Sequence, residues 1–113
     1  MHFTGTIVEE SLKDIRFLNQ TKVIGMRISP EENSENVWHL YKVSIEEAAI
    51  LELSRQLKSE QWYAHFWDGD TIVAVFPGKT FQFKYSDRST WSDAIKYGKS
   101  LNIPEVQLDF IIE

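Results

Sequence analysis

The sequence predicts an α+β domain in which a mainly antiparallel sheet carries two helices packed on one face. Stretches rich in aromatic and β-branched residues alternate with short turn signals, a pattern that is typical of antiparallel strands. Two further stretches carry apolar residues at helical spacing. The expected order is β-β-β-α-β-β-β-α followed by an extended tail, and residues 1–113 are expected to form a single domain.

The segment from Trp62 to Tyr85 is expected to form three consecutive strands around which the rest of the chain is organised. Asp68-Gly69 and Pro77-Gly78 are turn signals between its apolar runs. Two-residue turns at both positions would determine the pairing of the strands. The expected cross-strand pairs are Trp67–Asp70, His65–Ile72, Tyr63–Ala74, Phe76–Lys79, Ala74–Phe81 and Ile72–Phe83.

This pairing sorts the side chains of the three strands onto two faces, because successive residues of a strand point to opposite sides. The first face is almost entirely apolar and is expected to pack against the helices. The second face is expected to point away from them, and it keeps Trp62 and Phe66 among more polar neighbours. The first face consists of Tyr63, His65, Trp67, Ile72, Ala74, Phe76, Phe81, Phe83 and Tyr85.

The first half of the chain is expected to supply three strands and a helix. A short turn is expected between the first two strands, and the acidic segment 30–36 is expected to be an exposed hairpin loop. Ser44 and Glu47 have the spacing of a capping box, which predicts a helix from Ile45 to about Lys58. The three strands are predicted at residues 3–9, 22–29 and 37–43.

The C-terminal part is expected to contain a second helix and a tail. Thr90 and Asp93 form a second candidate capping box, and Asn102 can take the left-handed conformation that ends a helix. Pro104 prevents the helix from continuing. The tail, residues 106–112, is predicted to be a final edge strand, an extended segment laid over the core, or a segment that pairs with a neighbouring chain.

Composition narrows the classes of function. The net charge of −5 does not favour nucleic acid or an anionic membrane as a partner, because both need a cationic surface. The chain has no Cys, so disulfides, thiolate chemistry and Cys-ligated metals are excluded. No apolar stretch approaches the ~20 residues that span a bilayer, and the first residues lack a signal-peptide pattern. A cytoplasmic protein without a cofactor is expected.

His39 and His65 are the candidate catalytic residues, with Asp68 or Asp70 to orient an imidazole. Histidine transfers protons near neutral pH, so two imidazoles on neighbouring strands would suit a small acid–base enzyme. The simpler interpretation is that each is a partly buried histidine that fills space. No metal site is expected, because neither histidine has a local metal-binding spacing such as HxH or HExxH.

Large aromatic residues supply the candidate ligand-binding residues Trp38, Trp62, Phe66 and Trp67. They could line a pocket for a planar ligand, or they could belong to the core or to a subunit interface. A symmetric dimer formed through a sheet face or edge is the favoured interpretation. The expected function is therefore a non-catalytic, homodimerising domain with an aromatic pocket for a small molecule, and the alternative is the acid–base enzyme.

Four stretches of the sequence together resemble a group of short, single-domain, uncharacterised prokaryotic proteins. The resemblance covers most of the chain from Trp38 onward and implies a free-standing cytosolic protein. It brings no activity, cofactor or site residue with it. The stretches are residues 38–41, 62–67, 97–105 and 108–110, with the sequences WHLY, WYAHFW, YGKSLNIPE and LDF.

Overall fold

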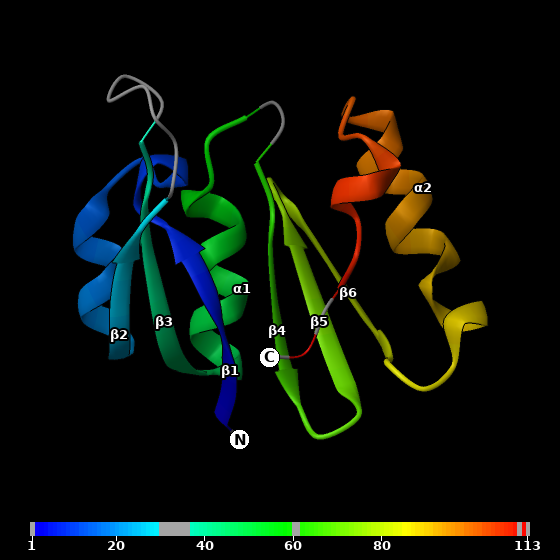
Figure 1. Ribbon diagram of the computed structural model, residues 1–113, viewed down its shortest axis with the longest axis horizontal. Coiled ribbons are helices and arrows are strands. Elements are labelled where there is room, and N and C mark those ends of the chain that lie inside the picture. The colour runs from blue at the N-terminus through cyan, green and yellow to red at the C-terminus, as the bar shows by residue number, and fades with distance from the viewer. Residues whose placement is uncertain (1, 30–36, 60–61, 111, 113) are drawn as a thin grey trace.

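The computed structural model of the protein describes residues 2–29, 37–59, 62–110 and 112 and shows a six-stranded sheet with two α-helices (Figure 1). The strand order is β2-β3-β1-β4-β5-β6, and every neighbouring pair is antiparallel. The α+β class with a mainly antiparallel sheet is therefore confirmed. The strands are β1 (His2–Val8), β2 (Lys22–Ile28), β3 (His39–Glu46), β4 (Ala64–Asp68), β5 (Thr71–Phe76) and β6 (Lys79–Lys84).

Short 3₁₀ segments and the two helices connect the strands. The link expected as one turn between β1 and β2 contains two of these segments, η1 and η2, and the predicted acidic loop at 30–36 lies outside the described residues. Among the described residues, no helix is both long and apolar enough to cross a membrane. The elements are η1 (Glu9–Ser11), η2 (Ile15–Gln20), α1 (Glu47–Gln56), η4 (Arg88–Trp91), α2 (Ser92–Ser100) and η5 (Glu105–Gln107).

The predicted capping box at Ser44 is wrong, because this residue belongs to a strand. Strand β3 continues to Glu46, and Ser44 pairs with Thr4 of β1. The neighbouring β3 side chains Val43 and Ile45 are fully buried. Burial of two β-branched side chains on a paired strand outweighs the local preference of a serine for a helix start. Helix α1 consequently begins only at Glu47, without a side-chain cap.

The two hairpins formed by β4, β5 and β6 match the predicted faces, although one register differs. Across the second turn Phe76 pairs with Lys79, as predicted, and Gly78 has a φ of +79° that suits a type II turn. Across the first turn Trp67 pairs with Ile72 instead of Asp70. The register is thus shifted by two residues, which leaves the side chains within these three strands on their predicted faces because the period of a strand is two.

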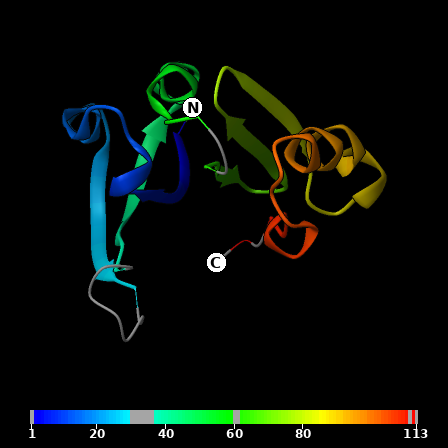
Figure 2. The same cartoon turned by 90° about the horizontal axis from the view of Figure 1, so that it is seen from above.

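The two helices lie on opposite faces of the sheet, so the prediction that both cover one face is wrong. Seen from above, α1 lies between the two halves of the twisted sheet, whereas α2 lies on the other side of β4–β6 (Figure 2). Strands β4 and β5 are buried on both sides because each face carries apolar side chains. The α1 side buries Ala64, Phe66, Val73 and Val75, and the α2 side buries Trp67, Ile72, Ala74, Phe76 and Phe83.

The position of Phe66 also differs from the prediction. It was expected to point outward, but it is fully buried on the α1 side. Its ring lies over Gly5, where strands β1 and β4 join through two residue pairs, Thr4–Trp67 and Gly5–Phe66. A Cβ atom on Gly5 would stand 2.4 Å from the Phe66 ring, so the absence of a side chain at Gly5 makes room for the phenyl group.

The C-terminal segment packs over the face of β4–β6 that α2 covers. The predicted cap at Thr90 is wrong, because its hydroxyl donates to the Asp87 carbonyl instead of capping α2. Asn102 does adopt the predicted left-handed conformation, with a φ of +64°. In the described part of the tail there is no strand, and Leu108 and Phe110 are buried against the core. Of the three alternatives predicted for the tail, its described residues therefore match a segment laid over the core.

Candidate ligand-binding groove

Three of the four aromatic residues predicted to bind a ligand lie around one groove. Trp38, Trp62 and Trp67 line it, whereas Phe66 lies on the other face of the sheet. Trp38 and Trp62 come from separate halves of the chain, and their rings meet edge to face with centroids 5.4 Å apart. The groove thus gathers aromatic rings that are distant in sequence.

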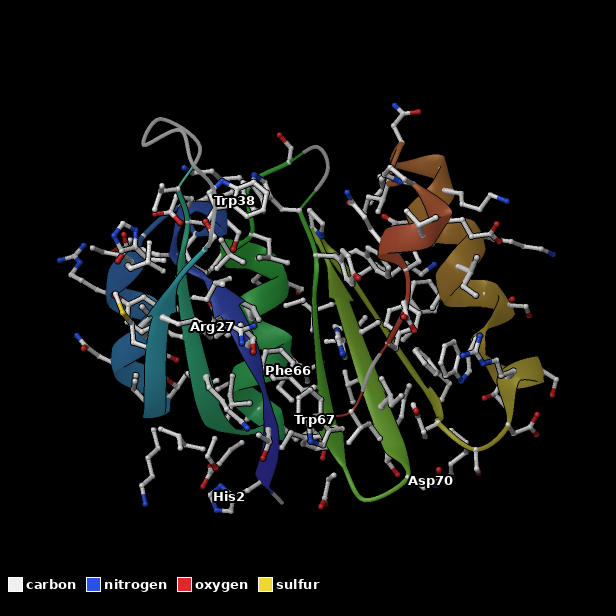
Figure 3. The ribbon with its side chains drawn as sticks, viewed as in Figure 1. His2, Arg27, Trp38, Phe66, Trp67 and Asp70 are labelled. Atoms are coloured by element: carbon white, nitrogen blue, oxygen red, sulfur yellow. The ribbon has the colours of Figure 1, made fainter. Side chains whose placement is uncertain are left out.

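The groove lies between the tail and strands β1, β2 and β4 of the sheet. Its volume is about 320 Å³, near the lower end of the range for small-molecule sites. Figure 3 shows Trp38 near the top of the β1–β4 junction, Arg27 reaching inward from β2, and Trp67 lower on β4. The lining residues are Thr6, Val8, Arg27, Trp38, Trp62, Tyr63, Ala64, His65, Trp67, Gln107 and Asp109.

Arg27 supplies a positively charged side chain to the groove. It lies on β2 opposite Leu40, so its side chain points to the face opposite that of Met26 and Ile28. In the part of the chain that the structure describes, Arg27 forms no hydrogen bond or ion pair. Its guanidinium is therefore available to an anion. The sequence carried a signal for it, since Arg27 interrupts the apolar alternation of Ile24, Met26 and Ile28.

Tyr63 forms the opposite wall together with the tail. Its hydroxyl donates to the carbonyl of Gln107, and its ring stacks on Phe76 with centroids 5.6 Å apart. Burial of the phenol, together with the nearby carboxylate of Asp109, raises the pKa of Tyr63 to about 12. The phenol therefore remains protonated at neutral pH and fixes the tail as a wall of the groove.

His65 lies on the groove face of β4 among aromatic rings. Its imidazole is stacked with Tyr63 at 6.4 Å and tilted against Trp67 at 5.7 Å. Phe110 of the tail meets it edge to face at 5.6 Å. The ring is half-buried and lines the groove, so it can contact a bound molecule.

His39 lies on the other face of the sheet, so the structure does not bring the two histidines into one site. It alternates with Tyr41 and Val43 on the α1 side. Its Nδ1 is 2.8 Å from Glu10 Oε2 and 3.6 Å from Glu9 Oε2. Because β1 separates β3 from β4 and the two rings face opposite ways, the imagined His39–His65 pair does not form.

The Glu9–Glu10–His39 cluster is an electrostatic unit of its own. The hydrogen bond to Glu10 raises the pKa of His39 above its usual 6.5. Partial burial of Glu10 acts to raise the pKa of its carboxyl, but hydrogen bonds from the side chain and backbone of His39 outweigh it and leave that pKa lowered. One donor atom from each of the three residues lies within 4.8 Å of the others, a set that could hold a metal ion. The sequence did not indicate this cluster, because Glu9 and Glu10 come close to His39 only when β1 and β3 pair.

Asp70 and Asp68 lie at the far end of the sheet and orient neither imidazole. Figure 3 shows Asp70 beside the β4–β5 turn, at the end of the sheet opposite Trp38. Its carboxylate accepts hydrogen bonds from the Ser86 backbone N–H and hydroxyl at 2.8 and 2.7 Å. The hydroxyl bond is the main reason that the pKa of Asp70 is lowered. Asp70 therefore ties the end of β6 to the turn.

No protein-family model, no curated protein and no solved structure matches the chain. The groove and the His39 cluster are consequently interpreted from their geometry alone.

Proposed function

We propose that the protein is a non-catalytic binding domain whose groove takes a small planar molecule with an anionic group. The guanidinium of Arg27, which has no hydrogen bond or ion pair with another described residue and lies beside an aromatic wall, is the observation that carries the proposal. Aromatic rings contribute apolar area and stacking, and a guanidinium forms paired hydrogen bonds with carboxylate or phosphate oxygens. A volume of about 320 Å³ suits a ligand of one or two rings.

The charged residues of the groove support an orientation in which the anionic group of the ligand lies on the β2 side. Asp109 supplies negative charge at the tail, near Tyr63, and would repel an anion there. Arg27 attracts the anion from the opposite wall, and the rings of Trp38 and Trp62 can stack against the planar part of the ligand. An acid–base reaction is not proposed, because His39 lies outside the groove. The cytoplasm remains the compartment in which we place this activity.

Binding of 2-naphthoate, with the uncharged 2-naphthamide as its neutral counterpart, tests the proposal. Three tryptophans line the groove and Trp91 is buried in the core, so a bound ring should quench tryptophan fluorescence. Replacing Arg27 by Gln should weaken naphthoate binding about tenfold, the loss of roughly one charged hydrogen bond, and leave naphthamide binding unchanged.

The matched control is Arg55→Gln on α1, which makes the same chemical change at an exposed residue outside the groove. It should leave both affinities at the wild-type value. If the Arg27 and Arg55 variants lost naphthoate affinity equally, the loss would reflect the net charge of the protein and not a contact with Arg27. If saturating naphthoate changed amide chemical shifts elsewhere in the protein and left those of residues 62–67 unchanged, the groove would not be the binding site.

A further inference from the structure

Strand β2 carries an exposed apolar surface at an open edge of the sheet. Among the described residues it has a strand neighbour on one side only, because it is the first strand in the order β2-β3-β1-β4-β5-β6. Four large apolar side chains on this strand are about half exposed, which is unusual for one short strand. They are Val23 at 47%, Ile24 at 56%, Met26 at 50% and Ile28 at 48%.

The backbone of β2 is also open to a further strand. The Ser29 N–H donates to the Trp38 carbonyl at 2.9 Å, so Ser29 directs its polar groups toward β3. Alternation along the strand then directs the N–H and C=O groups of Ile28 and Met26 to the open edge. Unpaired groups of this kind are the template for the addition of another strand.

We infer that β2 pairs antiparallel with β2 of a second copy, about a two-fold axis at Met26. This register joins the two sheets and places Ile28 of one copy near Ile24 of the other, the residue at which the pairing of β2 with β3 shifts register. Arg27 then lies opposite Gly25, where the space next to the Gly25 Cα is open for 4 Å. A two-fold axis at Arg27 would instead set two guanidinium groups opposite each other, which is destabilising.

The other edge of the sheet supports a closed dimer over a filament. Strand β6 carries the exposed residues Lys79 and Lys84 at its two ends. Lysines at an edge disfavour strand addition, so a β2-to-β6 contact that would propagate along a fibre is opposed. A β2-to-β2 contact uses the same surface on both copies and closes after two chains.

This dimer differs from the one expected from the sequence. The aromatic residues proposed for that interface do not form it, since Phe66 is buried and Trp62 lines the groove. The side chain of Met26 lies on the face opposite that of Arg27. The two grooves would therefore open on the same side of the continuous sheet and remain accessible.

Light scattering after size exclusion tests the contact on the full chain. The wild type should have the mass of two chains at high micromolar concentration. Met26→Lys, which sets two ammonium groups opposite each other, should shift the protein to the mass of one chain. Leu51→Lys is the matched control, because Leu51 is 56% exposed on α1 and is not part of β2, and it should remain dimeric. Circular dichroism should show that both variants are folded.

Cross-linking tests the register separately. The chain has no native Cys, so Met26→Cys introduces one thiol per copy. Opposed residues of a hydrogen-bonded antiparallel pair have Cα atoms about 5.5 Å apart, within the range of a disulfide. Mild oxidation should therefore link Met26→Cys into a covalent dimer and leave Leu51→Cys unlinked. A monomeric wild type, or a dimer that survives Met26→Lys, overturns the interface, and an intact Met26→Cys dimer that fails to link overturns the register.

Discussion

Replacing Gly5 by Ala tests how closely β1 and β4 approach each other at the centre of the sheet. A Cβ atom there would stand 2.4 Å from Phe66 Cδ1 and 2.5 Å from the backbone oxygen of His65. Ordinary contact begins near 3.4 Å, so the two strands would have to separate by about 1 Å. The phenyl ring could shift, but the carbonyl belongs to the backbone of a paired strand. Overpacking of this kind costs about 1–3 kcal/mol of the free energy of unfolding.

Gly25→Ala is the matched control for that substitution. Gly25 is also in a strand, and nothing lies within 4 Å of its added Cβ atom. In the Met26→Lys background, which removes the proposed contact of Gly25 with a second copy, loss of freedom in the unfolded chain should leave this variant neutral or stabilise it by up to about 1 kcal/mol. Gly98→Ala should fall between the two, because its closest neighbours, 2.7 and 2.9 Å away, are the terminal methyl groups of Leu108, which can rotate.

Urea denaturation of the three variants, at one concentration and equal oligomeric mass, measures these differences. The Gly5 variant should also lose about 4 °C of Tm for each kcal/mol. Because Thr6 and Trp67 next to this junction line the groove, its affinity for 2-naphthoate should fall too. A Gly5→Ala protein as stable as Gly25→Ala would refute the close approach of β1 and β4.

Three further outcomes follow from the packing and the ionisable groups. Phe110→Ala should lower the free energy of unfolding by about 3–5 kcal/mol in urea, because the ring is fully buried; a loss below about 1 kcal/mol would contradict the docking of the tail. Tyr63→Phe should remove the late phenol transition near pH 12 from an ultraviolet titration and cost about 1 kcal/mol, since the bond to Gln107 is lost. An NMR titration should give His39 a pKa above 6.5 that returns toward 6.5 in Glu10→Gln. The pair should stabilise the fold most between the two pKa values: the His39 contribution is lost as pH rises through its raised pKa, and the Glu10 contribution is lost as pH falls through its lowered one.

The features that the sequence predicted well are local ones. The turn at Pro77-Gly78 requires only a proline followed by a residue with positive φ, and the pairing of Phe76 with Lys79 follows from it. The shift at the first turn has the same local character. Only Gly69 has a positive φ there, which suits a type II′ turn at Gly69-Asp70 instead of the type I′ turn that was assumed.

The features that the sequence could not supply depend on the order of strands in the sheet. Phe66 is buried because β1 brings Gly5 beneath its ring, and no pattern within residues 62–85 contains that information. The same order brings Arg27 to the groove and separates His39 from His65. Three of the tryptophans named from the sequence nevertheless line the groove, and their role in binding a ligand stays a prediction.

The position of the groove implies that a ligand would couple the two halves of the chain. Arg27 and Trp38 come from the half that contains β1–β3, whereas Tyr63 directly precedes β4 and Gln107 belongs to the tail, and the strands of the two halves meet through two residue pairs. A ligand that binds only the folded groove stabilises it by mass action, by about 2.7 kcal/mol at a hundredfold excess over Kd. Saturating 2-naphthoate should therefore slow amide hydrogen exchange first at Gly5, at the β1–β4 junction. The amides of β5 and β6, which pair within one half, should change less. Equal protection of both regions would mean that the ligand stabilises the whole fold without bridging its halves.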